Sequence, residues 1–223
     1  MNRYESTNSL PTDFSLLGAH AGQPAVVIGN GRSRSGYDLT SLEVVTVGCN
    51  ALYREFAPDY LIAQDLNMII EIMSAGYADQ HKVLVPGGDL RNALLKLDKW
   101  TEDYPKMVVL SRTFNNSGNT ALYLALLMGC DPVYLLGFDG RVMTDDGEQN
   151  NIYYGTKNYT TSYCDPFIEA WPWTNGFERA VKDFPNRKVY AVESSFYPCE
   201  NVSQSAFAAA LARECQAAAT VDH

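Results

Sequence analysis

The sequence predicts an α/β fold: a mostly parallel, Rossmann-like sheet with helices on both faces and an irregular, aromatic-rich cap. Short β-branched runs alternate with helical patterns from Ala25 to Asp139, as in parallel sheets built with right-handed crossovers. Most of these runs stop at a small or polar residue, and open parallel sheets bind their ligands at such strand ends. From Arg141 to Asn175 the alternation stops, and irregular stretches of this length are typical of lids and binding loops.

One domain is expected over residues 25–223, with residues 141–175 as the cap and residues 1–24 as a loose polar leader. The expected strands are residues 25–28, 44–47, 60–63, 82–85, 107–110, 132–136 and 188–192. Helical patterns cover residues 51–56, 66–74, 89–100, 117–128, 176–184 and 203–219, with single turns near residues 14–17 and 38–42. Ser117 is the expected N-cap of the helix over residues 117–128, and Gly129 is its expected end. This helix is apolar almost all round and is therefore expected in the core.

Composition excludes several classes of function. The chain has 223 residues, of which 46% are hydrophobic and 19% charged, as in ordinary globular proteins. A formal net charge of −9 argues against a general nucleic-acid surface, which needs clustered cations. No apolar run reaches the roughly 18 residues of a spanning helix, and no signal peptide is recognisable.

The five cysteines are spread along the chain without a C-x-x-C pair or a Cys/His cluster. Neither a disulfide framework nor a metal site is therefore expected, and reduced thiols favour a cytoplasmic protein. The sequence is compatible with a homo-oligomer.

A glycine-containing loop follows the first strand: Gly29, Asn30, Gly31, Arg32 and Ser33. A buried strand that ends in such a tight turn is expected to leave backbone N–H groups free to face an anion. The alternative is that the glycines only form the turn. The stretch departs from G-x-G-x-x-G because Arg34 stands where the third glycine would be. Arg32 and Arg34 are close in sequence, which leaves a local basic pocket open despite the acidic net charge.

Polar residues follow the other strands as well. The expected nucleotide site is therefore built from the glycine loop, Asn50, the helix start at Ser117 and Gly118, and Asp139, with Asp65 close by. Amides, hydroxyls and carboxylates suit ribose and base, and a helix start suits a phosphate. Alternatively, Asn50 and Asp65 cap helices and Asp139 is a turn residue.

These residues also carry a resemblance. The GNGRS loop, Cys49-Asn50 and the segment SGNTALYLALLMGCDPVYLLGFDG (residues 117–140) resemble the nucleotide-binding half of bacterial sialyltransferases of the variant glycosyltransferase-A fold. They equally resemble related uncharacterised phage and bacterial proteins and the archaeal pterin pyrophosphokinases that share this core. The resemblance covers roughly residues 25–140 and implies that cytidine monophosphate contacts fall on Asn30, Gly31, Asn50, Ser117, Gly118 and Asp139.

The chain departs from the sialyltransferases in its cap. That family uses a lid histidine as general base, whereas residues 141–201 contain no histidine. Asp139 and Asp65 are therefore the expected catalytic carboxylates, since an enclosed carboxylate can act as a base. Arg141 or Arg32 is expected to neutralise a leaving phosphate.

Aromatic residues of the cap are further candidates. Tyr153 and Tyr154 are expected at the substrate, in a group with Tyr159, Tyr163, Trp171 and Trp173, although packing is the alternative role for all of them. The acidic run Asp145–Glu148 suits a hard cation or, more simply, a solvated turn.

The function expected from the sequence is a glycosyltransferase that uses a nucleotide-activated sugar and requires no cofactor. One alternative is a Mg²⁺-dependent, pyrophosphokinase-like phosphotransferase using ATP. The other is a nucleotide-binding protein without turnover.

Overall fold

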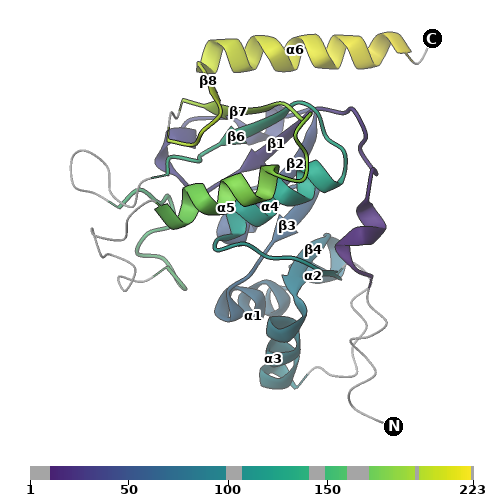
Figure 1. Ribbon diagram of the computed structural model, residues 1–223. Helices are drawn as coiled ribbons and strands as arrows, with labels where there is room; N and C mark the ends of the chain where they lie inside the picture. The colour runs from purple at the N-terminus through teal and green to yellow at the C-terminus, as the bar shows by residue number, and fades with distance from the viewer. Residues whose placement is uncertain (1–10, 99–106, 141–148, 160–170, 194–195, 222–223) are drawn as a thin grey trace.

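The protein is described by a computed structural model covering residues 11–98, 107–140, 149–159, 171–193 and 196–221 (Figure 1). Its described strands are β1 (Ala25–Ile28), β2 (Val45–Cys49), β3 (Tyr60–Ile62), β4 (Val83–Pro86), β5 (Met107–Leu110), β6 (Val133–Leu136), β7 (Val189–Val192) and β8 (Glu200–Val202). They form one eight-stranded sheet in the order β5-β4-β3-β2-β1-β6-β7-β8. Every described pairing is parallel, which confirms the predicted α/β sheet.

The strand order places a topological switch point beside β1. From β1 the chain adds β2 to β5 on one side, and β6 then returns to pair with the other side of β1. All residues of β1, β2, β3 and β6 are buried, as expected for central strands covered on both faces.

Helices cover both faces of the sheet, as predicted. The described helices are α1 (Leu66–Ser74), α2 (Tyr77–Gln80), α3 (Gly87–Leu97), α4 (Ser117–Leu127), α5 (Trp171–Val181) and α6 (Gln204–Val221). Short 3-10 helices are η1 (Asp13–Leu16), η2 (Arg32–Arg34), η3 (Leu39–Ser41) and η4 (Asn50–Arg54). Alternate residues of β1 belong to two separate cores. Val27 belongs to the core that contains residues of α4 and α5, and Val26 to the core that contains residues of α1, α3 and α6.

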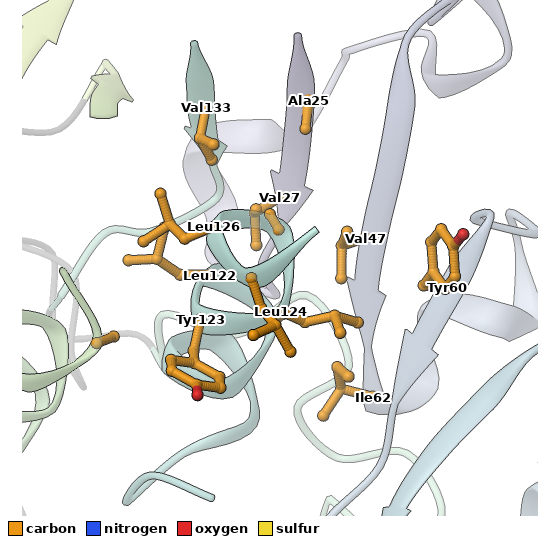
Figure 2. Close-up of a cluster of buried hydrophobic side chains, with 14 of the residues drawn as sticks. Ala25, Val27, Val47, Tyr60, Ile62, Leu122, Tyr123, Leu124, Leu126 and Val133 are labelled. Carbon is orange, nitrogen blue, oxygen red and sulfur yellow. The ribbon is translucent and has the colours of Figure 1, made fainter. Parts of the chain in front are cut away.

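Helix α4 is the core helix that the sequence predicts. Figure 2 shows Leu122, Leu124 and Leu126 of α4 beside Val27 and Val47 of the sheet. Gly129 ends the helix with a φ of +86°, which a glycine adopts without steric cost.

The N-cap of α4 differs from the expected Ser117. Asn116 takes that position, since its Oδ1 accepts the Asn119 N–H at 2.7 Å, and Ser117 becomes the first helical residue. Asparagine and serine are equally good caps, so local preference could not decide between the two neighbours.

Residues 11–24 are packed, in contrast to the loose leader expected there. Thr12 bridges Val109 at the edge of the sheet. The N–H groups of Gly18 and His20 donate to the carbonyls of Leu127 and Met128 at 3.0 and 2.8 Å. The segment therefore satisfies carbonyls that the end of α4 leaves without helical partners.

Helix α2 was not predicted, α3 covers residues 87–97 where residues 89–100 were expected, and two elements in the second half of the chain also differ from expectation. Strand β8 was not predicted, because Glu200, Asn201 and Val202 form a short, largely exposed edge strand without an apolar run. Helix α5 begins at Trp171, so the end of the predicted cap, residues 171–175, is helical. Of the rest of the cap, residues 149–159 are described, and residues 141–148 and 160–170 lie outside the described residues.

Candidate functional site

A cavity of about 170 Å³ lies at the carboxyl ends of β1, β2 and β6. Its lining contains Gly29, Asn30, Gly31, Cys49, Asn50, Asn116, Ser117, Gly118, Gly137, Phe138, Asp139, Gly140, Asn150, Asn151 and Tyr197. The cavity thus sits at the switch point between β1 and β6, where open α/β sheets bind ligands. Of the residues expected to bind nucleotide, only Arg32 and Ser33 lie outside this lining.

The glycines at this edge are required by close backbone approach. A Cβ on Gly29 would lie 2.5 Å from the Gly137 carbonyl oxygen, and a Cβ on Gly31 would lie 2.6 Å from the same atom. Neither Gly29 nor Gly31 has a positive φ, so the alternative of simple turn glycines does not explain them. They let the loops after β1 and β6 cross in contact.

The glycine loop does not present the row of free N–H groups that the sequence suggests. Successive N–H groups donate within the protein: Gly31 to the Gly137 carbonyl, Arg32 to Asn150 Oδ1, Ser33 to Asp139 Oδ2, Arg34 to the Gly31 carbonyl and Ser35 to the Arg32 carbonyl. Most of the N–H groups expected to face an anion are therefore occupied within the protein. The partners come from segments far along the chain, which a local pattern does not reveal.

Arg34 is a buried brace and does not form a basic pocket with Arg32. Its Nε donates to the Gly29 carbonyl at 2.8 Å, and its guanidinium donates to Glu55 Oε1 at 2.6 Å and to the Tyr153 hydroxyl at 2.8 Å. Only 4% of Arg34 is exposed. The arginine in place of a third glycine thus ties the loop to η4 and to the cap segment.

Asn30, Asn50, Ser117 and Tyr159 form a polar network across the cavity. Ser117 Oγ donates to Asn50 Oδ1 at 3.1 Å, and Asn30 Nδ2 donates to the Tyr159 hydroxyl at 3.0 Å. Burial raises the pKa of Tyr159, so its hydroxyl stays protonated. Asn50 has a φ of 54°, a left-handed conformation that asparagine tolerates better than most residues.

The start of α4 offers the donors that the glycine loop does not. As first and second helical residues, Ser117 and Gly118 have no intrahelical acceptor for their N–H groups. The structure gives these two groups no hydrogen-bond partner among the described residues. A helix start with free N–H groups and a positive dipole end suits an oxyanion.

The two expected catalytic carboxylates have different surroundings. Asp139 lines the cavity, but its Oδ2 accepts the Ser33 N–H at 3.0 Å and its Oδ1 accepts the Ser33 hydroxyl. Asp65 lies outside the lining, and its side chain makes no hydrogen bond to the described residues, not even the expected cap of α1. Desolvation, and secondly the Asp89 carboxylate, raise the pKa of Asp65, although the residue remains solvent-accessible.

The cap residues expected at the substrate lie in other positions. Tyr153 is buried, and its hydroxyl donates to Glu55 Oε1 while accepting from Arg34, so it packs rather than lining the cavity. Tyr154 is 40% exposed and also lies outside the lining. Arg141, Asp145–Glu148 and Tyr163 lie outside the described residues, as do the side chains of Trp171 and Trp173.

Tyr197 and three asparagines are lining residues that the sequence did not indicate. Tyr197 follows β7, and its hydroxyl has no hydrogen-bond partner among the described residues. Burial, and secondly Asp139, raise the pKa of Tyr197, which makes it a neutral donor. Asn116 was overlooked beside the expected cap Ser117, and Tyr197 was overlooked although it comes five residues after the predicted strand 188–192. Asn150 and Asn151 lie in the predicted cap, away from any predicted strand end, so no signal placed them here.

Other chemistry is limited in the part of the chain that the structure describes. That part contains no cluster of three or more metal-ligating side chains. His20 contacts the Tyr60 hydroxyl at 2.9 Å and His81 stacks on Tyr77, both outside the cavity lining. Within the same ranges, no helix combines the length and apolar character needed to cross a bilayer.

No protein-family model matches the sequence, and no curated protein is significantly similar to it. Among solved structures, the chain is similar to the MAf glycosyltransferase from Magnetospirillum magneticum AMB-1, with a TM-score of 0.50 and 12% identity. That alignment covers 96% of this chain, and the chain spans 42% of that protein.

Two structures of the sialyltransferase CstII are also similar, one of them from Campylobacter jejuni with cytidine-5'-monophosphate and the other with a trisaccharide acceptor and CMP. Their TM-scores are 0.48 and 0.42, both at 12% identity, over 77% and 75% of this chain and 80% of each of those chains. The similarity to the MAf enzyme shows that the chain has a glycosyltransferase fold, as the resemblance of its motifs predicted.

Proposed function

We propose that the protein is a glycosyltransferase that binds a nucleotide-activated sugar in the cavity between β1 and β6. The observation that carries this proposal is the convergence of Asn30, Asn50, Ser117 and Gly118 on one cavity at the switch point of a glycosyltransferase fold. The free N–H groups at the start of α4 would hold an oxyanion of the donor.

The size of the cavity indicates how much of the donor it would enclose. A volume of about 170 Å³ is below the roughly 300–1,000 Å³ of pockets that bury a whole drug-sized ligand. We therefore expect this space to enclose one part of the donor, with the remainder lying toward the cap.

Transfer of the sugar needs groups that stabilise the departing phosphate and a base that takes a proton from the acceptor. An acceptor hydroxyl attacks the anomeric carbon, the bond from that carbon to a phosphate oxygen breaks, and the nucleotide leaves with the electron pair. The helix start and the Tyr197 hydroxyl would stabilise the charge on the departing phosphate. A carboxylate would take the proton of the acceptor hydroxyl, and Asp65 suits this role better than Asp139 because its raised pKa and unengaged oxygens leave it able to accept a proton. Arg141 and Arg32 remain candidates for neutralising the phosphate.

A ligand screen tests the proposal. Thermal unfolding is measured with mono-, di- and triphosphates of all bases, with and without Mg²⁺. A ligand at about 100 times its dissociation constant adds roughly 2.7 kcal/mol of stability, or about 5–10 °C for a domain of this size. Stabilisation without Mg²⁺, followed by nucleotide release from the corresponding nucleotide sugar, supports the transferase.

A matched pair of variants ties the result to this cavity. Tyr197→Phe removes a cavity hydroxyl that holds no described partner, so it should reduce the ligand-induced shift without lowering the melting temperature of the free protein. Tyr190→Phe, whose ring stacks on Tyr134 away from the lining, should change neither. Stabilisation only by ATP with Mg²⁺ would favour phosphotransfer. Nucleotide binding without nucleotide release from a sugar donor would favour a non-catalytic binder. No response to any nucleotide would refute the site.

A further inference from the structure

Five asparagines surround the cavity: Asn30, Asn50, Asn116, Asn150 and Asn151. Each amide carries an acceptor oxygen and an NH2 group with two donors. If the protein already hydrogen-bonds one end of an amide, the other end is left to face a ligand. The hydrogen bonds of these side chains therefore predict whether the cavity presents donors or acceptors.

In three of the five, the protein uses the oxygen. Asn116 Oδ1 accepts the Asn119 N–H at 2.7 Å, Asn150 Oδ1 accepts the Arg32 N–H at 3.0 Å, and Asn151 Oδ1 accepts the Tyr153 N–H at 2.9 Å. A backbone N–H can only donate, so these partners fix which end of each amide is the oxygen.

The other ends of these amides remain available. The NH2 groups of Asn116, Asn150 and Asn151 have no hydrogen-bond partner among the described residues, and none of them is sealed from solvent. Asn50 differs, since its Oδ1 accepts from Ser117 Oγ and its side chain also hydrogen-bonds Tyr159. Asn30 differs as well, because its NH2 group donates to Tyr159.

We propose that the NH2 groups of Asn116, Asn150 and Asn151 form, with the start of α4, an uncharged site for an oxyanion of the ligand. This inference rests on the proposed function and names the chemistry of that site: a phosphate or carboxylate group of the sugar nucleotide, held by neutral N–H donors. The described lining contains no Arg, Lys or His. Its one carboxylate, Asp139, is held by Ser33 through both oxygens, which orients it toward the loop.

An isosteric substitution separates the two ends of the amide. Asn116→Asp keeps the oxygen that caps α4, because aspartate is as good an N-cap as asparagine, and replaces the donor group by an anionic oxygen. Asn150→Asp does the same at the second site while keeping an acceptor for the Arg32 N–H. Isothermal titration calorimetry would compare cytidine and uridine with their 5'-monophosphates, and glucuronate with glucose.

We expect both variants to bind the oxyanion probe about 10- to 100-fold more weakly than the wild type, since a hydrogen bond to a charged group is lost. Affinity for the neutral nucleoside and the melting temperature should change little. Asn67→Asp is the control, because Asn67 is exposed near the start of α1, lies outside the lining and undergoes the same change of charge.

The outcomes separate this inference from the proposed function. Loss of monophosphate binding alone identifies a phosphate, and loss of glucuronate binding identifies a carboxylate. If a monophosphate binds and both variants bind every oxyanion within twofold of the wild type, the inference is overturned while the nucleotide site stands. If no nucleoside, monophosphate or sugar acid binds the wild type, both proposals are overturned.

Discussion

Replacing Arg34 tests the idea that this residue braces the loop after β1. Arg34→Met keeps the length of the side chain and removes every donor. The Gly29 carbonyl and the Tyr153 hydroxyl, both buried, then lose the guanidinium that contacts them at 2.8 Å each. Glu55 is different, because 45% of its side chain is exposed and its charge stays hydrated.

The magnitude follows from these three contacts. A buried acceptor without a donor costs about 1–3 kcal/mol, whereas an exposed ion pair contributes about 0–1 kcal/mol. Burial of the methionine offsets part of the loss, so we expect a net destabilisation of about 3 kcal/mol. In a domain of this size that corresponds to a melting temperature lower by about 6–12 °C.

Thermal and urea unfolding of three variants would check this expectation. Arg34→Lys should be intermediate, because one ammonium group cannot reach all the acceptors that the planar fork of arginine serves. Arg32→Met is the control: its side chain is exposed on the same loop, and the change should stay within about 0.5 kcal/mol. If Arg34→Met melts within about 2 °C of the wild type, the brace contributes little and the reasoning is refuted.

Three other substitutions probe neighbouring groups. Tyr159→Phe removes the hydroxyl that accepts from Asn30, and should weaken nucleotide binding about 5- to 10-fold in calorimetry, more than it lowers stability. Asp65→Asn should raise the free energy of unfolding at pH 7, measured in urea, because the raised pKa of Asp65 means that its charged form is disfavoured in the folded protein. The same variant should abolish transfer if Asp65 is the base. Glu71 accepts from Arg54 and Tyr53, and these contacts lower its pKa despite the opposing effect of burial. The stability it contributes is present above its ordinary pKa of 4.5 and is lost as the pH falls through the lower folded value, so Glu71→Gln should flatten the acid limb of a stability–pH curve.

Most strands of the sheet could be predicted because each is marked by its own residues and their immediate neighbours in the sequence. Strands such as Ala25–Ile28 and Met107–Leu110 are short apolar runs with polar ends, and the largely apolar α4 follows a polar segment that marks the start of a helix. Strand β8 lacks such a signal, since its place depends on pairing with β7 and not on its own side chains. Strand order likewise follows from packing between distant segments.

The candidate site was predictable in part for the same reason. Asn30, Asn50 and Ser117 stand at strand or helix ends, so the rule for parallel sheets brings them to one edge. The role of Arg34 was not readable, because its partner Tyr153 lies 119 residues away. The N–H of Arg32 likewise donates to Asn150, 118 residues along the chain, so this group does not face a ligand.

The uncharged lining and the raised pKa of Asp65 are physically consistent with each other. A lysine or arginine in the cavity would attract a phosphate more strongly than an amide does, but its charge would also lower the pKa of a nearby carboxylate and weaken it as a base. The described lining contains no such cation, and Asp65 instead experiences desolvation and the charge of Asp89. Neutral donors from α4 and the asparagines would therefore hold an anionic group without lowering the pKa of Asp65, the carboxylate proposed to accept the proton. Introducing a cation at a lining position without a positive φ, as in Asn151→Lys, should accordingly tighten nucleotide binding in calorimetry and slow transfer, with the pH dependence of the rate shifted to lower pH.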